Sequence, residues 1–513
     1  MTDTLHPYPE YKDSGQTWLG QVPRHWPVLP NRAIFDEVKD REHPDEEMLS
    51  VTITRGIVRQ KALLADSSKK DSSNLNKSAY KLVQPRDIAY NKMRAWQGAI
   101  AASELRGIIS PAYVVMRLRE DANLPRYFHH LYRTPLFAKE AERWSYGITS
   151  DVWSLRPEHF KVIYTPLPPP DEQAAIVRFL DHAHGRIDRA IRAKRKIITL
   201  LNEQKQAIIA SLVTGKCEVG RVKSEEGREK GEDGSDISLF TPRPSHFMKP
   251  SGIPWLGDIP QHWDVSPLKG VCTIQSGITL GKDYEGQSLR EYPYLRVANV
   301  QAGHTNLTVM KKIRVTKAEA ERCLLQRGDV LMTEGGDPDK LGRGCVWEEQ
   351  VNPCLHQNHV FAVRPNQSRL VPNFLAVLMG TSYARAYFQS TSKQTTNLAS
   401  TNKTKIGMFK VLLPSIDEQC NILSALKEET RPVSTAISNF EREIALLREF
   451  RTRLTADVVT GKLDVRREKS EEGRVKSEEG RGKGEEGRVK GEGDWGKEDE
   501  AEALETEEGG EDE

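Results

Sequence analysis

The stretch Tyr90–Gly98 carries side chains that can contact the phosphates and base edges of a nucleic acid. It places Lys92, Arg94, Trp96 and Gln97 close together in the chain. Lys and Arg pair with phosphates, Arg can bridge guanine, and Gln or Asn can bridge adenine, each good pair discriminating between bases by about 1 to 3 kcal/mol. Taken alone, such a segment is more often a solvated surface loop.

Three further stretches carry the same chemistry. One is Tyr146–Asp151, and the other two are Thr333–Asp337, a glycine-opened turn with basic residues beyond it, and His356–His359, which adds amide and imidazole groups. Because polar side chains concentrate in these stretches, we predict that they read base edges in a groove of DNA. The residues predicted to make these contacts are Lys92, Arg94, Trp96, Gln97, Thr149, Ser150, Thr333, Glu334, Lys340, Arg343, Gln357 and Asn358.

The sequence offers no comparable set of residues for catalysis. Gly215-Lys216 lacks the upstream glycine and the following Ser or Thr of a phosphate-binding loop, and no G-x-G-x-x-G follows a predicted strand. The Asn-Pro-Pro-aromatic and Asp-Pro-Pro-Tyr elements of amino-methyltransferases are also missing. The carboxylates of Gly335–Asp339 suggest either a nuclease metal site or a bend between strands, and the bend is favoured because no Glu-x-Lys lies nearby. We therefore expect a chain that is not itself an enzyme and binds no metal or cofactor.

Two phrases occur twice in the chain. Ser14–Trp26 and Ser251–Trp263 share the pattern S-G-x-x-W-L-G-x-V/I-P-x-H-W, 237 positions apart. Pro168–Gln173 opens a long helical pattern that closes on Val-Thr-Gly-Lys, and Pro414–Gln419 opens a second one 246 positions later that closes in the same way. A spacing this long indicates a duplicated domain rather than a solenoid, so we expect internal pseudo-two-fold symmetry.

Both helical patterns carry a seam whose residues are spaced alternately four and three apart, which is the coiled-coil repeat. Lys205 and Arg451 occupy the same seam position, where a basic residue either fixes the register or partner or lays its stem over apolar neighbours. Asp171 and Asp417 are predicted N-caps, and the glutamate after each complements the helix dipole. The seam residues, predicted to form a spacer and to dock partners, are Ile187, Ile191, Ile198, Leu201, Lys205, Ile208, Leu212, Val433, Ile437, Ile444, Leu447, Arg451, Leu454 and Val458.

The helices are long enough to set a distance. Asp171–Leu212 would form a rod of about 60 Å at about 1.5 Å per residue, and an antiparallel pair of such rods would carry globular parts at its ends. The globular parts are predicted to be mixed in structure. Strand character is found in Ala112–Leu118, Tyr292–Val300, Asp329–Met332 and His359–Val363, and residues 127–142 and 370–380 have helical character.

Charge is distributed unevenly along the chain. The formal net charge is +2, but residues 467–513 hold 9 basic and 19 acidic residues, so residues 1–466 carry about +12. A basic body suits a nucleic-acid partner. Residues 217–246 and 467–513 contain glycine-bearing charged repeats without an apolar seam and are predicted to be disordered. Since no signal peptide, membrane-spanning stretch or paired cysteine motif is recognisable, we expect a cytoplasmic protein with reduced cysteines.

Taken together, these motifs resemble the specificity (S) subunits of Type I restriction-modification enzymes over nearly all of residues 14–466. The charged repeats in the linker and tail depart from the family pattern. The phrases that carry the resemblance are Trp18-Leu19-Gly20 with Pro23-x-His25-Trp26 and their repeat, Tyr90–Gly98 followed by Ser110–Tyr113, Tyr294–Val300, Gly328–Asp337, Gly342-Arg343-Gly344 and the paired Asp-Glu-Gln helices.

The resemblance implies a reader of double-stranded DNA with two target-recognition domains, each recognising one half of a split sequence, held apart by conserved helices. It also implies that two methylation (M) subunits dock on those helices and supply S-adenosylmethionine chemistry on adenine. Restriction (R) subunits would supply cleavage that depends on ATP and Mg. Two other hypotheses stay open at this point, a stand-alone DNA-binding regulator and a self-sufficient nuclease or methyltransferase.

We therefore expect an α+β protein in which two mixed α/β target-recognition domains are separated by two long helices that form an antiparallel coiled coil, with pseudo-two-fold symmetry. The expected division is a first recognition domain (1–170), a first helical spacer (171–216), a charged linker (217–246), a second recognition domain (247–416), a second helical spacer (417–466) and an acidic tail (467–513).

Overall fold

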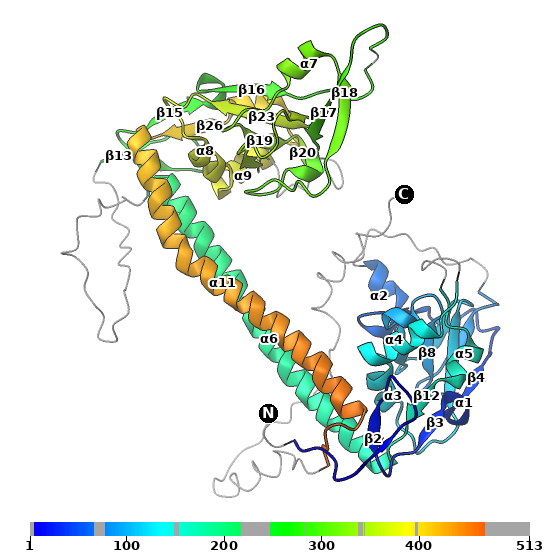
Figure 1. Ribbon diagram of the computed structural model, residues 1–513. Coiled ribbons are helices and arrows are strands. Elements are labelled where there is room, and N and C mark those ends of the chain that lie inside the picture. The colour runs from blue at the N-terminus through cyan, green and yellow to red at the C-terminus, as the bar shows by residue number, and fades with distance from the viewer. Residues whose placement is uncertain are drawn as a thin grey trace, which may run out of the picture. The chain divides into compact units, whose positions relative to one another are not determined.

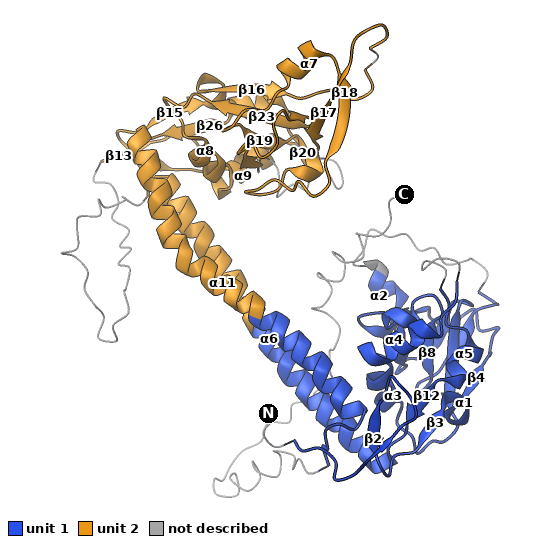
Figure 2. Ribbon diagram, viewed as in Figure 1, with its two compact units in different colours: residues 1–193, 443–513 blue, residues 194–442 orange. Residues whose placement is uncertain are grey.

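The computed structural model describes residues 5–65, 77–147, 153–216, 247–282, 284–336, 342, 344–394 and 399–466 (Figure 1). They belong to two compact units, residues 1–193 with 443–513 and residues 194–442 (Figure 2). The boundary between the units crosses both long helices, α6 (Pro170–Val213) and α11 (Ile416–Val459), so each unit holds one globular part and a segment of each helix. The linker 217–246 and the tail 467–513 lie outside the described residues, and the expected six-part division stays a prediction.

The globular part of the first unit is built on an antiparallel four-stranded sheet of order β4-β11-β8-β9. Rings from α3 and α4, among them Phe128, Tyr132 and Phe137, are fully buried in its core. Its strands are β1 (Tyr11–Asp13), β2 (Gln21–Pro23), β3 (Val28–Pro30), β4 (Phe35–Val38), β5 (Leu49–Thr52), β6 (Gly56–Arg59), β7 (Lys81–Val83), β8 (Ile88–Asn91), β9 (Ile100–Ala102), β10 (Gly107–Ile109), β11 (Tyr113–Leu118) and β12 (Tyr164–Pro166), and its helices are α1 (Asn31–Ile34), α2 (Gln60–Ala65), η1 (Ala95–Gln97), α3 (Pro125–Tyr132), α4 (Pro135–Arg143) and α5 (Pro157–Val162).

The second unit repeats this plan with an antiparallel sheet of order β16-β23-β19-β21. Its three-stranded sheet, β18-β17-β22, has a reduced counterpart in the first unit, where β5 pairs with β6 and Met48 forms an isolated parallel bridge with Ile108 of β10. Its strands are β13 (Met248–Pro250), β14 (Asp258–Pro260), β15 (Asp264–Pro267), β16 (Cys272–Ser276), β17 (Arg290–Leu295), β18 (Lys311–Val315), β19 (Val330–Thr333), β20 (Gly335–Gly336), β21 (Gly344–Val346), β22 (Leu355–His356), β23 (Val360–Pro365), β24 (Lys393–Gln394), β25 (Ala399–Ser400) and β26 (Lys410–Leu413), and its helices are η3 (Leu268–Gly270), η4 (Val297–Asn299), α7 (Lys317–Arg322), α8 (Pro372–Met379), α9 (Ser382–Thr391) and α10 (Lys403–Met408).

The mixed α/β class is confirmed, and the predicted elements are found with changed bounds. The helix expected at 127–142 is two helices, because Thr134 caps α4 by accepting a hydrogen bond from the amide of Phe137 while Pro135 occupies its first turn. The strand expected at 292–300 ends at Leu295 and continues as the short helix η4.

The two four-stranded sheets contain the same buried Asp–Arg ion pair. Arg117 on β11 donates two hydrogen bonds to the buried carboxylate of Asp87 (2.8 and 2.9 Å), and Arg364 on β23 does the same to Asp329 (2.7 and 2.8 Å). Each carboxylate also accepts from a backbone amide three residues earlier. Burying a carboxylate costs free energy unless it is paired. The arginines therefore stabilise the same arrangement in both sheets, with a buried aspartate directly before β8 and before β19.

Within each unit the segments of α6 and α11 run antiparallel. In the first unit His184 Nε2 lies 2.9 Å from Thr455 Oγ1, and Arg451 Nη1 lies 2.9 Å from Asp188 Oδ1. In the second unit Lys194 Nζ lies 5.2 Å from the centre of the Phe440 ring. Every predicted seam residue is buried or half-buried, and the Asp188 pair shows that Arg451 is neutralised at its seam position as well as packed.

Candidate nucleic-acid interface

The predicted cluster Lys92–Gln97 lies in the connection between β8 and β9, here called the first sheet loop (residues 92–99). The loop folds on itself, since Asn91 Oδ1 accepts from the amide of Met93 (3.0 Å) and Trp96 Nε1 donates to the carbonyl of Met93 (2.9 Å). Gly98 closes it with a φ of 96°. Arg94 and Gln97 are exposed, while Lys92 and Trp96 are half-buried, so the loop presents a cation and an amide on a formed turn.

The first sheet loop packs against the segment that follows the second predicted cluster. The rings of Trp96 and Trp153 meet edge to face with centroids 5.7 Å apart, and the amide of Leu155 donates to the carbonyl of Lys92 (2.9 Å). The structure therefore brings Trp153 and Leu155, which follow this cluster in the chain, beside the loop. Thr149 and Ser150 themselves lie outside the described residues, so their predicted role stays a prediction.

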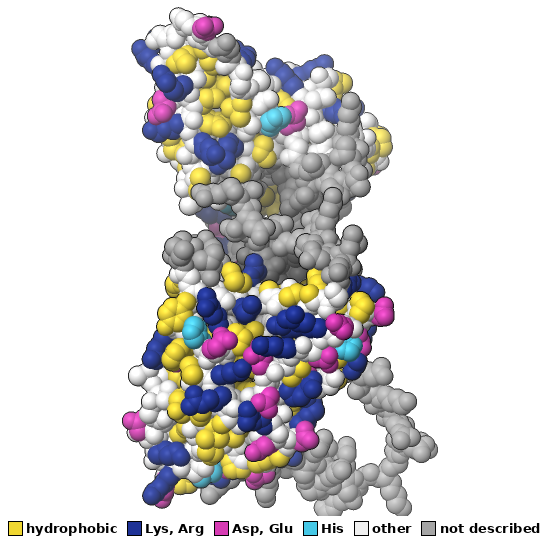
Figure 3. Space-filling model, turned by 90° about the vertical axis from the view of Figure 1, so that its right-hand side faces the viewer, with side chains coloured by type: hydrophobic (Ala, Val, Ile, Leu, Met, Phe, Trp, Pro, Cys, Tyr) yellow, Lys and Arg dark blue, Asp and Glu magenta, His cyan; other side chains and the backbone are white. Residues whose placement is uncertain are grey.

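The first unit carries concentrated positive charge near this loop. Burial lowers the pKa of the Lys81 ammonium, and the positive charges of Lys92, Arg41 and Lys39 lower it further, against the opposing effect of Glu37. Lys and Arg side chains also gather on the face of this unit drawn in Figure 3. Such a field favours a polyanionic partner.

The second predicted set lies at the same connection of the second sheet. Residues 334–343, between β19 and β21, form the second sheet loop, of which the structure describes 334–336 and 342. The backbone of Glu334 makes two hydrogen bonds: its carbonyl accepts from the amide of Thr401, and its amide donates to the carbonyl of His359 (both 2.8 Å). The first bond has a counterpart in the first sheet loop, where the carbonyl of Lys92 accepts from the amide of Leu155. Lys340 and Arg343 lie outside the described residues, and their predicted contacts stay predictions.

The other predicted residues of the second unit lie near Glu334 and differ in how far their side chains are exposed. Glu334 Oε2 lies 2.6 Å from His359 Nδ1, so part of its hydrogen-bonding capacity is already used. Thr333, Gln357 and Asn358 are half-buried. The expectation that His356 also contributes its imidazole was wrong, since this ring is fully buried, lies 2.6 Å from the carbonyl of Val360, and has its pKa lowered to about 4 mainly by burial.

Arg133, directly after α3, ties the first sheet loop to its neighbour. Its Nη2 donates to the carbonyls of Ile53 (2.6 Å) and Thr54 (2.7 Å), and its Nη1 lies 3.4 Å from the carbonyls of Gly98 and Ile100. One guanidinium thus joins the β5–β6 turn to the end of the loop. Sequence reasoning missed this residue, because nothing in the local pattern distinguishes it from a surface arginine of an amphipathic helix.

The repeated phrases meet at a joint in each unit. In the first, Glu172 in the first turn of α6 accepts from Trp26 Nε1 (2.8 Å) and lies 2.6 Å from His25 Nε2. In the second, Glu418 accepts from Trp263 Nε1 (2.9 Å) and lies 3.1 Å from His262. The His-Trp and Asp-Glu-Gln phrases therefore repeat together because they bond to each other.

The glutamines of these phrases bond to the domain helices. The side-chain oxygen of Gln173 accepts from the amide of Leu124, just before α3, and that of Gln419 accepts from the amide of Val371, just before α8 (both 2.8 Å). Both glutamines are fully buried, so they connect the start of each long helix to the start of a domain helix. This role was also missed.

The expected N-caps were wrong by one to two residues. The helix α6 begins at Pro170 and α11 at Ile416, so Asp171 and Asp417 lie inside the first turn. In α11 the cap is Ser415, whose hydroxyl accepts from the amide of Glu418 (3.3 Å). The acidic residues still complement the positive end of the helix dipole.

The Val-Thr-Gly-Lys phrase completes each joint from the other helix. The end of α6 packs on the second unit's phrase, where a Cβ on Gly215 would lie 2.4 Å from Pro260 Cδ. The end of α11 packs on the first unit's phrase, where a Cβ on Gly461 would lie 2.3 Å from Pro23 Cδ. Only glycine permits this approach, and both glycines have a positive φ, as helix C-termini require.

Comparison with known proteins points to one family. Residues 260–444 match the family model for the Type I restriction modification DNA specificity domain. The EcoKI specificity subunit of Escherichia coli (strain K12) is 20% identical over 463 residues, which cover 85% of this chain and 91% of that protein. Residues 260–444 therefore carry this domain, and over most of its length the chain is similar to Type I specificity subunits.

Other members of this family align over different shares of their length. The StySPI specificity subunit of Salmonella potsdam is 21% identical and covers 86% of this chain and 94% of its own length. A protein described as the MjaX specificity subunit of Methanocaldococcus jannaschii is 25% identical over 190 residues, 36% of this chain and 44% of that protein. A solved chain described under "Structural basis underlying complex assembly and conformational transition of the type I R-M system" shares the fold, with a TM-score of 0.57, 17% identity and coverage of 85% and 98%.

Among the residues that the structure describes, no group of three or more His, Cys, Asp or Glu side chains is placed to hold a metal ion. Within the same part of the chain, no helix combines the length and apolar character needed to cross a bilayer.

Proposed function

We propose that this chain is the DNA-recognition subunit of a Type I restriction-modification complex and reads a bipartite target through its two globular parts. The observation that carries this proposal is the position of the two sheet loops. Both leave the same strand of sheets with the same order and the same buried Asp–Arg pair, yet their sequences differ. A constant frame with two different loops suits a protein that recognises two different half-sites.

The first sheet loop is the better equipped of the two. Arg94 and Gln97 are exposed on a turn that is braced by Arg133 and by the Trp96–Trp153 contact, so they lose little conformational freedom on binding. In the second unit Gln357 and Asn358 supply the amides next to Glu334 and His359. DNA phosphates would be held by the basic side chains around each loop.

We propose that M subunits dock on the long helices and R subunits join the same complex. The seam itself is buried, so the docking face must use outward-facing residues. Ile197 and Leu200 on α6 and Leu446 on α11 are 39%, 54% and 55% exposed. Exposed apolar side chains on a helix favour a protein partner. Under this proposal S-adenosylmethionine, ATP and Mg bind to those partners, and this chain performs no chemistry itself.

The helices would act as the spacer between half-sites. Readers on one face of a duplex must lie close to whole helical turns of about 34 to 36 Å apart, a distance within the span of a rod of about 60 Å. Inserting four residues at Ala193 and at Asn439 should change the gap between the recognised half-sites and leave the half-sites themselves the same. An unchanged gap would contradict the spacer proposal.

The test of DNA reading uses the full chain assembled with M subunits and maps methylated adenines. Replacing residues 251–413 by those of another family member should change one half of the target only. Arg94→Ala and Gln97→Ala should weaken binding of the cognate duplex by about 5- to 150-fold each, from about 1 to 3 kcal/mol per lost base contact, with less effect on unrelated DNA. Arg24→Ala is the control, because this exposed arginine pairs with Glu10 outside the sheet loops.

Four results would contradict the proposal. A change in both halves of the target, or in neither, would argue against independent readers. Equal loss of binding in the control and in the loop variants would show that charge alone is involved. Tight specific binding without M subunits would favour the stand-alone regulator, and methylation by the chain alone would favour a self-sufficient enzyme.

A further inference from the structure

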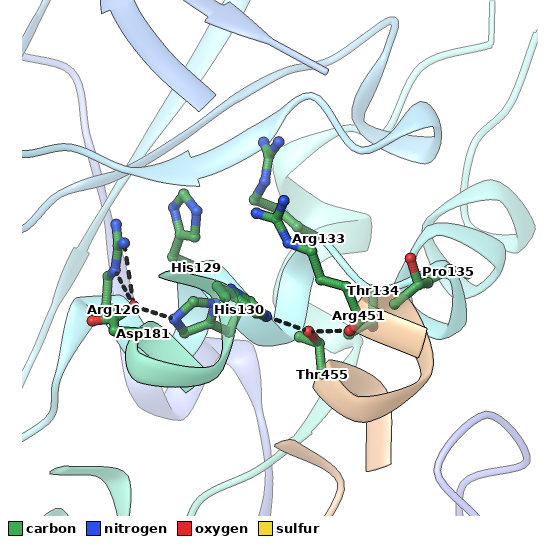
Figure 4. Close-up of a pocket in the computed structure, with 11 residues that line it drawn as sticks. Arg126, His129, His130, Arg133, Thr134, Pro135, Asp181, Arg451 and Thr455 are labelled. Atoms are coloured by element: carbon green, nitrogen blue, oxygen red, sulfur yellow. Dashed lines mark hydrogen bonds and ion pairs between the residues drawn. The ribbon is translucent and has the colours of Figure 1, made fainter. Parts of the chain in front are cut away.

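A polar cleft of about 210 Å³ lies in the first unit, where the end of α3 faces α6 and α11 (Figure 4). A water molecule takes about 30 Å³ in the liquid, so the cleft has room for several waters or for one tetrahedral oxyanion. Its wall is strongly basic. The titratable residues that line it, apart from the single carboxylate of Asp181, are Arg126, His129, His130, Arg133, His184 and Arg451.

The positive charge in the cleft is only partly neutralised. Arg126 lies 3.3 Å from Asp181 Oδ1 and 3.4 Å from Glu104 Oε1, and Arg451 Nη1 lies 2.9 Å from Asp188 Oδ1. Arg133 donates to backbone carbonyls and has no carboxylate partner among the described residues. Burial, and then the positive charges of Arg451 and Arg126, lower the pKa of Arg133 to about 10.

The histidines of the cleft are held neutral by the same environment. Burial and then Arg451 lower the pKa of His184 to about 3, and burial lowers the pKa of His129 well below its usual range with further contributions from Arg133, His130 and Arg126. His129 Nδ1 is buried and has no hydrogen-bond partner in the described part of the chain. An anion in the cleft would reverse these effects, because negative charge favours the protonated imidazole.

The second unit contains a cleft at the equivalent position with different chemistry. It lies against α8 and α6. Its lining residues on α8 stand 247 positions after the lining residues of the first cleft on α3, and its lining residues on α6 stand 246 positions before those of the first cleft on α11. It has a volume of about 680 Å³, and Arg385 and Glu348 line it with opposite charges. In place of Arg126, His129, His130 and Arg133 it has Asn373, Ala376, Val377 and Gly380.

The comparison between the clefts shows that the common frame does not require the basic residues. Four successive cleft-facing positions of the helix are cationic or imidazole-bearing in one unit and uncharged in the other. Of the three arginines, Arg133 alone has no carboxylate beside it among the described residues, so a bound anion would favour its charged form.

We propose that this cleft is a binding site for a phosphate-type oxyanion, free in solution or carried on a nucleic-acid backbone. Arg126 and Arg451, whose side chains are 38% and 40% exposed, supply the accessible charge. Arg133 lines the cleft and also holds the first sheet loop, so an occupied cleft would stabilise that loop and leave the second unit unaffected. The proposal does not depend on the function proposed above.

The test is calorimetric titration of the full chain with inorganic phosphate. We expect saturable binding of phosphate at millimolar concentration or below. The double variant Arg126→Gln, Arg451→Gln should bind at least about tenfold more weakly. Arg385→Gln, which changes the cleft of the second unit, should bind like the unchanged chain. If circular dichroism shows that the double variant is misfolded, the single variant Arg126→Gln replaces it in the titration, because the Arg126 side chain is 38% exposed and its loss should disturb the fold less.

A second arm separates the two sources of the anion. If a short duplex DNA at saturating concentration abolishes phosphate binding, the site takes a backbone phosphate, and if phosphate still binds, it takes a free oxyanion. The proposal is overturned if the unchanged chain binds no phosphate at millimolar concentration, or if Arg126→Gln and Arg385→Gln weaken binding equally.

Discussion

Replacing Glu172 by Ala tests whether the repeated phrases form one structural joint. Glu172 is the acceptor for Trp26 Nε1 (2.8 Å) and for the Tyr8 hydroxyl (3.2 Å), and these two residues are 0% and 3% exposed. Water cannot take the place of the carboxylate, and each buried donor left without an acceptor costs about 1 to 3 kcal/mol. His25 and Arg466 are 42% and 39% exposed and should add little. We expect Glu172→Ala to destabilise the first unit by about 2 to 5 kcal/mol.

The second joint provides a matched comparison within the same chain. Glu418 is 31% exposed and accepts from one buried donor, Trp263 Nε1, while its other partner, His262, is 63% exposed. Glu418→Ala should therefore cost less, about 1 to 3 kcal/mol, because solvent can reach the vacated position. Glu172→Gln keeps one acceptor oxygen and should fall between Glu172→Ala and the unchanged chain.

Hydrogen exchange of the full chain, followed by mass spectrometry, measures each joint separately. A chain with two units has no single free energy of unfolding, whereas local exchange reports the opening of each part. Glu172→Ala should accelerate exchange at the start of α6 and in residues 21–26, and leave the start of α11 unchanged. Equal effects of the two alanine variants, or acceleration at the wrong joint, would show that the carboxylate bonds do not set the stability of these junctions.

Three further predictions concern single residues. Gly461→Ala should lower the melting temperature more than Gly252→Ala. Both positions have a positive φ (+78° and +66°), so both variants carry backbone strain of about 1 to 2 kcal/mol. Only at Gly461 would the added Cβ also lie 2.3 Å from Pro23 Cδ, which adds overpacking of about 1 to 3 kcal/mol, whereas Gly252 has no atom within 4 Å. Arg133→Met should accelerate exchange at residues 52–54 and 98–100 and weaken recognition of one half-site only, and a loss at both half-sites would contradict its local role. His356 has a pKa of about 4, so the unfolded chain takes up this proton below about pH 6.5 and stability should fall by about 1.4 kcal/mol per pH unit between about pH 6.5 and 4; unfolding of His356→Gln at pH 7 and pH 5 should lack that contribution.

Much of the fold could be predicted from local pattern. The strands β11, β19 and β23 and the helix α8 were found close to their expected positions, because burial of one face leaves a periodic trace in the chain. The break between α3 and α4 also had a local signal, the Thr-Pro pair that caps α4. The buried pairs of Asp87 with Arg117 and of Asp329 with Arg364 were missed, since their partners lie on different strands.

The sequence by itself determined the duplication, the two long helices and the composition of the sheet loops, because repeats, periodicity and residue type are properties of neighbouring positions. Only the tertiary structure decided what the repeated phrases do. Glu172 meets Trp26 across 146 positions, and Gly461 meets Pro23 across the whole length of the folded chain. The basic cleft likewise combines α3, α6 and α11. Such contacts depend on how distant elements pack, and no local pattern encodes the distance between two side chains that only packing brings together.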